Sequence, residues 1–376
     1  MTKRIAALDV LRGVAIMGTL GTNIWIFTHP GGPAQLMGLG GDRGAVETFL
    51  TFLTNGKFLG LLTLLFGIGL ELQYRSAVRK GLTWPGRYLW RAALLFAEGA
   101  LHYVLIFEFD VLMGYAVIAV IVAYLIGRSD RVIRSWMVAA GALHVSLVGL
   151  LTLAMLTTGD IDSPTSATAL YTEGSWLDQV VTRLRDLPLY RSELIFIIPM
   201  GIVLFLLGAR LLRAGVFDER GAALRSRLIV IGLGVAAPLN LATSFAGPAW
   251  FAVDRYILPP LVALGLLGLI SSITLGLRGT PGPVRTALAN VGRTALSCYV
   301  LQNLVAGVLC YGWGLGLAAE LDWLRPWWVP VAWAGICLLF MTLASLWLRR
   351  FHRGPLELAW QWAYQAPWTK RGSMHT

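Results

Sequence analysis

Charged residues are scarce in this chain, and their scarcity excludes several classes of protein. Asp, Glu, Lys and Arg together make up 14% of the 376 residues, against about 25% in ordinary soluble domains. A soluble enzyme or an isolated DNA-binding domain is therefore excluded. Although the net charge is +11, the basic residues fall between long apolar runs and form no single stripe, so we expect no nucleic-acid partner.

Cysteine is also scarce, with three residues in the whole chain. Cys298, Cys310 and Cys337 all lie inside apolar segments and lack the spacing of metal ligands. Neither a disulfide framework nor a zinc site is supported, and we expect no metal.

What the chain does have is long hydrophobic segments. Apolar residues make up 56% of the sequence, and the mean hydropathy is +0.67. A membrane-spanning helix needs about 20 mostly apolar residues. This criterion predicts an all-α polytopic membrane protein, with a single domain over residues 1–376. About ten spanning helices are expected near 5–28, 57–76, 86–107, 109–127, 132–157, 193–214, 227–247, 254–276, 290–313 and 328–348.

The distribution of Lys and Arg predicts the orientation, because cytoplasmic loops are rich in these residues. With the N-terminus inside, most of them fall on the cytoplasmic side, and few are left for the opposite side. We therefore expect a multi-pass protein of the inner (plasma) membrane with both termini in the cytoplasm. Asp9 and Arg12 interrupt the start of the first helix and no cleavage site follows, so we expect no cleaved signal peptide.

Two connections on the outside are longer than a turn. Residues 29–55 open with His-Pro-Gly-Gly-Pro, which cannot be helical, and continue as an amphipathic stretch at 46–54. We expect this stretch to form a short interfacial or re-entrant helix. Residues 158–192 form the only extended polar segment.

The first predicted helix carries polar residues that a membrane span normally lacks. Asp9 lies one turn from Arg12 and can pair with it. Arg12 and Asn23 are eleven residues apart, so they share one face at a distance of roughly 16 Å. An ionisable group inside a membrane is costly, which makes these residues candidates for a functional site.

The third predicted helix repeats this arrangement. Arg91 and His102 share one face roughly 16 Å apart, with Glu98 on the same stripe. His102 is either a core histidine bonded to a backbone carbonyl or a functional group near mid-membrane, at a depth that matches Asn23. Asp110 follows in a tight turn, where it either orients the His102 ring or caps the next helix.

The ninth predicted helix and the tail supply further candidates. The helix has a continuous polar side formed by Arg293, Ser297, Tyr299, Gln302 and Asn303. Interhelical hydrogen bonds alone could explain Ser297 and Asn303, whereas Arg293 suits anion binding. The tail at 351–368 is rich in Trp and Tyr, which is typical of anchoring at the membrane interface, with Glu357 as the exception.

Several of these features occur together. They are Leu-Asp-Val-Leu-Arg-Gly-Val-Ala-Ile with Asn23, Lys57-Phe58 followed by Leu65-Phe66-Gly67, the Arg91 to His102 helix leading to Asp110, Gly292-Arg293 through Tyr299 and Gln302, and the closing Gly354-Pro355-Leu356-Glu357. In this combination the chain resembles the YeiB family of bacterial membrane proteins. The resemblance runs from the first helix to the tail and covers residues 158–192 least.

The first-helix motif and the Arg91 to His102 spacing are also similar to those of the wider transmembrane acyltransferase superfamily. That superfamily includes the acyltransferase-three proteins and the lysosomal heparan glucosaminide N-acetyltransferases. Its members carry an acyl group from cytoplasmic acyl-CoA to an acceptor, often a sugar, on the far side. The resemblance implies that Arg91 and His102 stand at the donor and catalytic positions. Asn23 stands where many acyltransferase-three proteins have a histidine, which leaves fewer groups for proton transfer.

The leading hypothesis is therefore transfer of an acyl group, most simply acetyl, to an extracytoplasmic or membrane-embedded acceptor such as a sugar or glycolipid. Acyl-CoA would be a co-substrate docked on Arg87, Arg91 and Arg293, and no cofactor is expected. His102 would take the acceptor's proton or carry the acyl group, with Asn23 on the oxyanion and Asp110 in support. The other candidate substrate-binding residues are Arg12, Glu98, Tyr299, Gln302 and Glu357.

Two other classes of function stay open. A transporter or flippase would use Asp9, Arg12, Glu98 and His102 as a proton or substrate path. It would be favoured by inverted repeats or a matching pair of broken helices, and the sequence reveals neither. A membrane scaffold, whose polar groups serve only helix packing, would have a dry interior. A homodimer is also left open.

Overall fold

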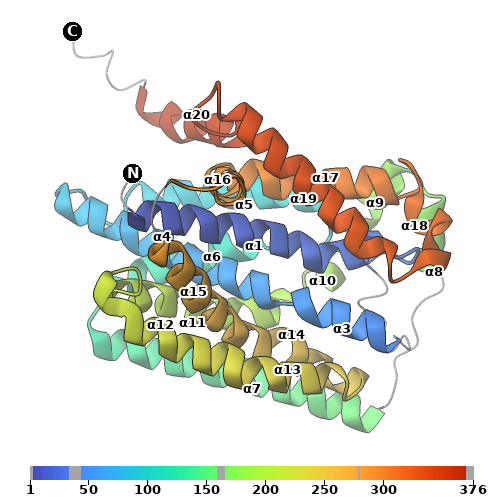
Figure 1. Cartoon of the computed structure of the whole chain (residues 1–376), viewed down its shortest axis with the longest axis horizontal. Coiled ribbons are helices and arrows are strands. Elements are labelled where there is room, and N and C mark those ends of the chain that lie inside the picture. The colour runs from blue at the N-terminus through green and yellow to red at the C-terminus, as the bar shows by residue number, and fades with distance from the viewer. Residues whose placement is uncertain (1–2, 34–43, 159–165, 278–279, 370–376) are drawn as a thin grey trace.

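The computed structural model describes residues 3–33, 44–158, 166–277 and 280–369, and these form a bundle of helices without any strand (Figure 1). The predicted all-α class is confirmed. The longer elements are α1 (Lys3–Phe27), α3 (Ala45–Thr54), α4 (Lys57–Arg79), α5 (Tyr88–Leu105), α6 (Leu112–Leu125), α7 (Asp130–Thr158), α9 (Trp176–Arg185), α11 (Leu194–Arg213), α12 (Ala222–Ile229), α13 (Ala237–Ser244), α15 (Leu258–Gly276), α16 (Pro283–Arg293), α17 (Ala295–Cys310), α19 (Trp328–Trp347) and α20 (Pro355–Thr369). The short ones are α8 (Ser166–Thr172), α10 (Leu187–Tyr190), η1 (Glu219–Gly221), the π-helix η2 (Val230–Ala236), η3 (Pro248–Trp250), α14 (Phe251–Tyr256), α18 (Leu317–Glu320) and η4 (Asp322–Leu324).

Each of the ten predicted segments coincides with helix, but the segments differ in their ability to span a membrane. Among the described residues, seven helices are long and apolar enough, or eight if one bent pair is a single span. The two that fall short are α5 and α6. Helix α6 has 14 residues, and the 18 residues of α5 include Arg91, Glu98 and His102, which lower its hydropathy.

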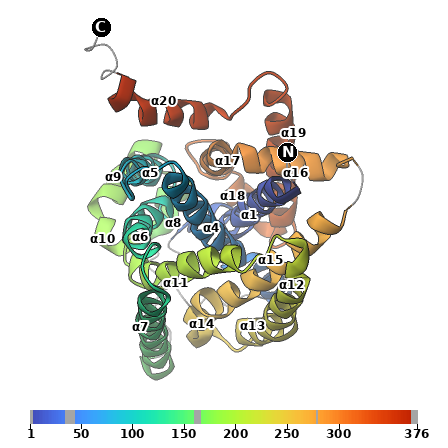
Figure 2. The same cartoon turned by 90° about the vertical axis from the view of Figure 1, so that its left-hand side faces the viewer.

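The segment predicted as one helix near 290–313 is broken. Helices α16 and α17 meet at Thr294 with a bend of 92°. In the view along the bundle, α16 lies across the end of the bundle, while α17 points along its axis (Figure 2). The hydrogen bonds at the break explain how it is stabilised. The backbone N–H groups of Leu296 and Ser297, in the first turn of α17, bond to the carboxylate of Glu357 in the tail instead of to carbonyls of α16.

Two glycines allow α1 and α16 to cross in backbone contact. A Cβ atom at Gly292 would lie 1.8 Å from the carbonyl oxygen of Asp9, and one at Gly13 would lie 2.0 Å from that of Leu288. A side chain at either position would therefore push the helices apart. This crossing fixes the start of α1 beside the bend that precedes α17.

The bundle has two distinct ends (Figure 1). We call the end where α1 begins and α4 and α11 finish the terminus end, and the end that carries α8, α9 and α18 the opposite end. The basic connections near 75–91, 128–134 and 210–227 all lie at the terminus end, as the alternation of charge predicts. Which end faces the cytoplasm stays a prediction.

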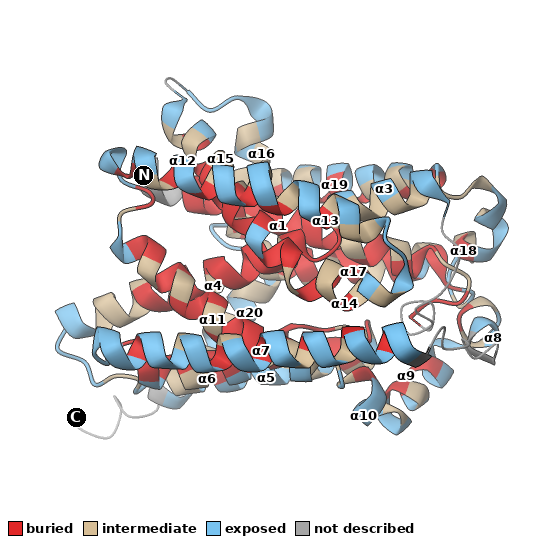
Figure 3. Cartoon of the chain, turned by 90° about the horizontal axis from the view of Figure 1, so that it is seen from below, coloured by how far each residue is buried: buried red, intermediate tan, exposed pale blue. Residues whose placement is uncertain are grey.

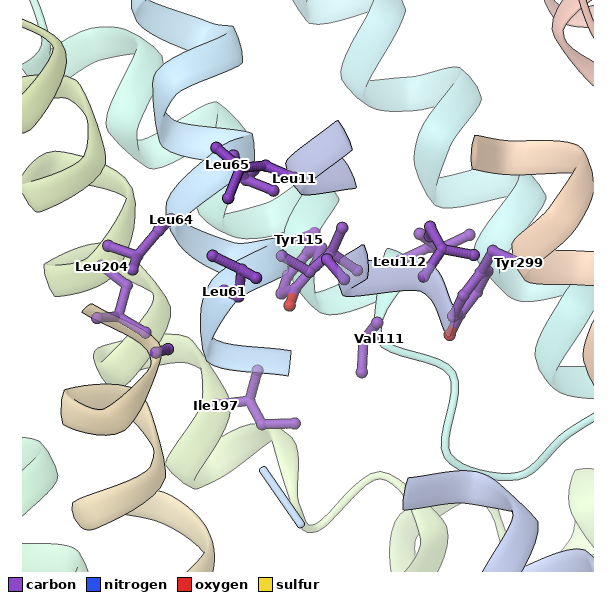
Figure 4. Close-up of a cluster of buried hydrophobic side chains, with 14 of the residues drawn as sticks. Leu11, Leu61, Leu64, Leu65, Val111, Leu112, Tyr115, Ile197, Leu204 and Tyr299 are labelled. Atoms are coloured by element: carbon purple, nitrogen blue, oxygen red, sulfur yellow. The ribbon is translucent and has the colours of Figure 1, made fainter. Parts of the chain in front are cut away.

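Burial follows the position of each helix in the bundle. Helices α1 and α4 are mostly buried, whereas the outer face of α7 is exposed along its length (Figure 3). The exposed residues of α7 include Val138, Leu143 and Leu150, as expected for a face in contact with lipid. The apolar core joins α1, α4, α6 and α11, and Tyr299 of α17 lies at its edge beside Leu112 (Figure 4).

Candidate functional site

His102 lies in the last turn of α5 and is buried, with 2% of its surface exposed. Its Nδ1 atom is 3.0 Å from Oδ1 of Asp110, and its Nε2 atom is 3.3 Å from Nδ2 of Asn303. An ionised carboxylate only accepts hydrogen bonds, so Nδ1 carries the proton. Nε2 is then the basic nitrogen and accepts a hydrogen bond from the Asn303 amide; this tautomer follows from the hydrogen-bond partners.

Asn303 continues the network to the first helix. Its Oδ1 atom accepts a hydrogen bond of 3.1 Å from Nδ2 of Asn23, and its own Nδ2 also donates to the carbonyl of Tyr299 at 3.1 Å. The Tyr299 and His102 ring centroids are 5.1 Å apart. We call the sequence Asp110, His102, Asn303 and Asn23 the polar chain. It joins α1, α5, α17 and the turn before α6 inside the membrane domain.

Asp110 fulfils both of the roles that the sequence left as alternatives. Oδ1 accepts from the imidazole of His102, and Oδ2 accepts from the backbone N–H of Met113, which caps the start of α6. The close approach of α5 and α6 depends on Gly99, where a Cβ atom would lie 2.8 Å from Oδ2 of Asp110. The same carboxylate therefore fixes both the helix and the histidine ring.

The structure places Asn23 one residue further from His102 than the sequence analysis supposed. Asn23 contacts Asn303, and Asn303 contacts His102. Sequence analysis had explained Asn303 by helix packing alone. The signal that could have found it is its spacing of four residues from Tyr299, on the polar side of the same helix.

Arginines from three helices lie at the terminus end. The Arg91 guanidinium stacks on Trp360 of α20, with its central carbon 4.6 Å from the ring centroid. The predicted pair between Arg12 and Asp9 is present at 3.3 Å. Arg293, at the end of α16, acts electrostatically on the same Asp9 carboxylate, and Arg12 acts on Arg91. We call Arg12, Arg91 and Arg293 the basic group. Arg87 lies at the start of α5, one turn before Arg91.

Of the remaining candidates, Glu357 and Gln302 have structural partners. Glu357 accepts hydrogen bonds from the backbone N–H groups of Leu296 and Ser297, at 2.8 and 3.3 Å, and from the Ser297 hydroxyl. It thus caps α17 and compensates the positive end of that helix. Gln302 donates to the carbonyl of Ile16 at 3.2 Å and ties α17 to α1. Within the described part of the chain, Oε2 of Glu98 is buried and has no hydrogen-bond partner.

Two small cavities, each lined in part by charged side chains, lie between the polar chain and the opposite end. The first, of about 20 Å³, is lined by Asn23 and Tyr299 on one side and by Glu193 and Arg255 on the other. The second, of about 40 Å³, shares Thr22 and Arg255 with the first. Cavities of this size hold one or a few water molecules.

Sequence analysis missed several charged residues on this side of the site. Residues 158–192 were predicted only as a polar connection, yet they contain the whole of α8 and the buried Arg183 of α9. Arg255 was counted only as an outside charge, but it pairs with Glu193 at 2.9 Å beside the first cavity. The sequence signal that could have indicated Arg183 is its spacing of four residues from Gln179, which places both side chains on one helix face. In the structure Arg183 donates a hydrogen bond of 3.2 Å to the Gln179 side chain. Among the residues that the structure describes, no three His, Cys, Asp or Glu side chains gather closely enough to hold a metal ion.

Comparison with known proteins finds a family model and relatives that resemble this chain. A family described as "Protein of unknown function (DUF418)" matches residues 211–366. The chain is 26% identical over 395 residues to "Uncharacterized protein YxaH" of Bacillus subtilis, with 97% of this chain and 95% of the relative covered. It is 28% identical over 388 residues to "Uncharacterized protein YeiB" of Escherichia coli, with 96% of each covered. No solved structure gives a significant match. Both relatives align with the chain over nearly their whole lengths, which confirms the resemblance to the YeiB family.

Proposed function

We propose that this protein is a membrane acyltransferase that uses acyl-CoA bound at the terminus end and an acceptor that reaches His102 from the opposite end. In this proposal the terminus end faces the cytoplasm and the protein resides in the inner membrane. The similarity of the first-helix motif and of the Arg91 to His102 spacing to transmembrane acyltransferases supports it.

The observation that carries the proposal is the arrangement around the His102 ring. Its Nδ1 atom faces the Asp110 carboxylate, which leaves Nε2 as the base. The neutral amide of Asn303 contacts Nε2 at 3.3 Å, so a hydroxyl or amine of the acceptor can take that place. The site lies between the basic group and the two cavities, as a transfer between the two sides requires.

The basic group would bind the donor. Acyl-CoA carries several phosphate groups, and guanidinium groups bind phosphate through paired hydrogen bonds. Arg12, Arg91 and Arg293 would hold these phosphates, with Arg87 at the rim. From there the pantetheine arm would extend along α5 to His102, roughly 16 Å away.

The reaction then needs one proton to move twice. Nε2 of His102 takes the proton of the acceptor X–H while X attacks the thioester carbonyl carbon. The C–S bond breaks, and the CoA thiolate leaves with the proton from Nε2. Asp110 keeps the ring oriented and balances the charge of the imidazolium. Asn303, displaced from Nε2, and Asn23 offer amide N–H groups to the oxyanion. In a two-step variant, Nε2 itself attacks the thioester and passes the acyl group to X.

One observation favours transport as a second candidate function. The bent pair α16 and α17 is a broken helix of the kind found in transporters, and Glu98 has a buried oxygen without a partner in the described structure. Asp9, Arg12, Glu98 and His102 would then line the path. Asp9 and Arg12 are bonded to each other. Glu98 and His102 would therefore be the groups that carry protons along the path.

The test measures CoA release from radiolabelled acetyl-CoA by the purified protein in proteoliposomes with added sugars and membrane lipids. We expect His102→Gln to abolish release and product labelling without changing the melting temperature. His352→Gln, at an exposed position, is the control and should retain the rate of the unaltered protein.

The supporting residues provide a graded comparison. Asn23→Ala and Asp110→Asn should leave measurable residual rates, because loss of one oxyanion donor costs about 10²–10³ in rate. Near-normal transfer by His102→Gln would contradict the mechanism and would make transport or binding the better explanation.

A further inference from the structure

The turn between α5 and α6, residues 106–111, is held from the opposite end by one guanidinium group. Arg191, just before α11, donates from Nη1 to the carbonyl of Asp110 at 2.9 Å and from Nη2 to the carbonyl of Glu108. Its guanidinium also stacks on Tyr103, with the central carbon 4.1 Å from the ring centroid. Arg191 therefore binds the backbone of Asp110, the residue whose side chain orients His102.

A separate set of contacts ties α9 to the same turn. Arg183 donates from Nε to the Glu108 carboxylate at 2.8 Å, and both side chains are almost completely buried. Burial lowers the pKa of Arg183, but the Glu108 carboxylate raises it by more, so the guanidinium stays charged. Tyr171 also donates to Glu108 at 2.9 Å. These contacts hold α8 and α9 through the side chain of Glu108, whereas Arg191 bonds to the backbone carbonyl of that residue.

The two sets of contacts differ in what they can control. The Arg183 pair binds the side chain of Glu108, whereas Arg191 binds the two carbonyls on either side of Phe109. The Asp110 carbonyl belongs to the peptide plane that follows Asp110, so Arg191 restricts the rotation of one of the two planes that set the direction of this side chain. The Glu108 carbonyl belongs to the plane before Phe109, so the same guanidinium also fixes the approach of the chain to Asp110. Lysine could not make the same two hydrogen bonds, since its ammonium is a point donor and lacks the planar, forked guanidinium of arginine.

We propose that Arg191 is a positioning residue for His102 that acts through Asp110. Its effect on rate rests on the proposed acyl transfer, whereas its effect on the His102 ring does not. Without Arg191, the Asp110 carboxylate would leave its position 3.0 Å from Nδ1, and the ring would no longer be held with its proton on that nitrogen.

The experiment uses ¹⁵N-histidine NMR of the full-length protein in detergent micelles, with the His102 signals assigned by their absence in His102→Gln. Nitrogen chemical shifts distinguish the Nδ1–H from the Nε2–H tautomer. We expect Nδ1–H alone in the unaltered protein and a mixture of tautomers in Arg191→Lys. Asp110→Asn should give the same change, and the double variant should match Asp110→Asn. A thermal melt of each variant reports folding separately.

The matched control is Arg185→Lys. Like Arg191, Arg185 lies in the connection between α7 and α11. Its side chain, however, is 82% exposed and pairs with Asp186. This variant should keep the tautomer and turnover of the unaltered protein. Arg191→Lys should lower kcat toward the roughly 10²-fold loss that a displacement of about 1 Å can cause, with KM for acetyl-CoA unchanged.

The two proposals fail in different ways. An unchanged tautomer in Arg191→Lys, or rate losses for Arg191→Lys and Asp110→Asn that multiply in the double variant, would overturn the positioning role. A changed tautomer in a protein that shows no acyl transfer would keep the positioning role and overturn the proposed function.

Discussion

At the scale of single residues, Asn303 links the two halves of the polar chain, His102 with Asp110 on one side and Asn23 on the other. Its Nδ2 atom serves both Nε2 of His102 and the carbonyl of Tyr299, while its Oδ1 atom accepts from Asn23. Removing this amide takes a partner from three neighbours, whereas removing Asn23 takes one from Asn303 alone. The interior of the bundle is thus more sensitive at α17 than at α1.

Asn303→Ala should therefore cost more turnover than Asn23→Ala. We expect a loss at or above the upper end of the roughly 10²–10³ range for one oxyanion donor, measured as CoA release. Asn290→Ala is the control, since the only hydrogen bond described for the Asn290 side chain goes to Ser345, at 3.3 Å. A rate of Asn303→Ala equal to that of the Asn290→Ala control would show that Asn303 serves packing alone.

Arg91 tests the donor side of the site. Arg91→Ala should weaken acyl-CoA binding measured by calorimetry, because a guanidinium that would bind phosphate is removed. Arg91→Lys should lose less affinity, since it keeps the charge but not the paired hydrogen bonds. Arg134→Ala, on the exposed start of α7, should bind as the unaltered protein does. An unchanged dissociation constant in Arg91→Ala would move the donor site elsewhere.

At the scale of elements, the site depends on how closely α5 approaches the start of α6. A Cβ atom at Gly99 would lie 2.6 Å from the backbone nitrogen of Met113, and backbone cannot move aside as a flexible side chain can. The hydrogen bond between Asp110 and His102 spans this approach. The separation of α5 and α6 is therefore set by the absence of a side chain.

Gly99→Ala should destabilise the fold by about 1–3 kcal/mol, as overpacking does, and should also lower turnover. Thermal melting and CoA release measure the two effects. Gly69→Ala in α4 is the matched control, because nothing lies within 4 Å of its Cβ position. It should be neutral or gain up to about 1 kcal/mol from its higher helix propensity. A melting temperature of Gly99→Ala equal to that of the control would contradict the close approach.

At the scale of the whole molecule, the two ends of the bundle differ in charge and in structure. The basic connections gather at the terminus end, and the helices α8, α9 and α18 cover the opposite end (Figure 1). If basic loops stay in the cytoplasm, residues 166–192 lie outside.

Single-cysteine labelling tests this orientation in intact cells, after the three native cysteines have been replaced by alanine. An impermeant maleimide should modify Glu173→Cys, and it should reach Lys80→Cys only after the cells are permeabilised. Both positions are exposed, so access to the side chain does not differ between them. The reverse labelling pattern would reverse the orientation and the direction of the proposed transfer.

The sequence by itself determined the features that depend on local geometry. Apolar length placed helix at all ten predicted segments, because the backbone must satisfy its own hydrogen bonds in lipid. Helical spacing predicted the pair between Asp9 and Arg12, three residues apart. The contact between His102 and Asp110 spans only eight residues and one tight turn, so the sequence could also anticipate it.

Only the tertiary structure decided which distant residues meet. His102 and Asn303 are 201 positions apart, and Asn23 and Asn303 are 280 apart. Their contacts depend on the break at Thr294, which the hydropathy of 290–313 does not reveal because apolar residues continue on both sides of it. The hydrogen bond between Arg191 and the Asp110 carbonyl could not be predicted from the sequence either, because these residues are 81 positions apart. Hydrophobic burial is non-directional and predicts that helices pack, but the angles and partners come from close packing and from paired polar groups far apart in the chain.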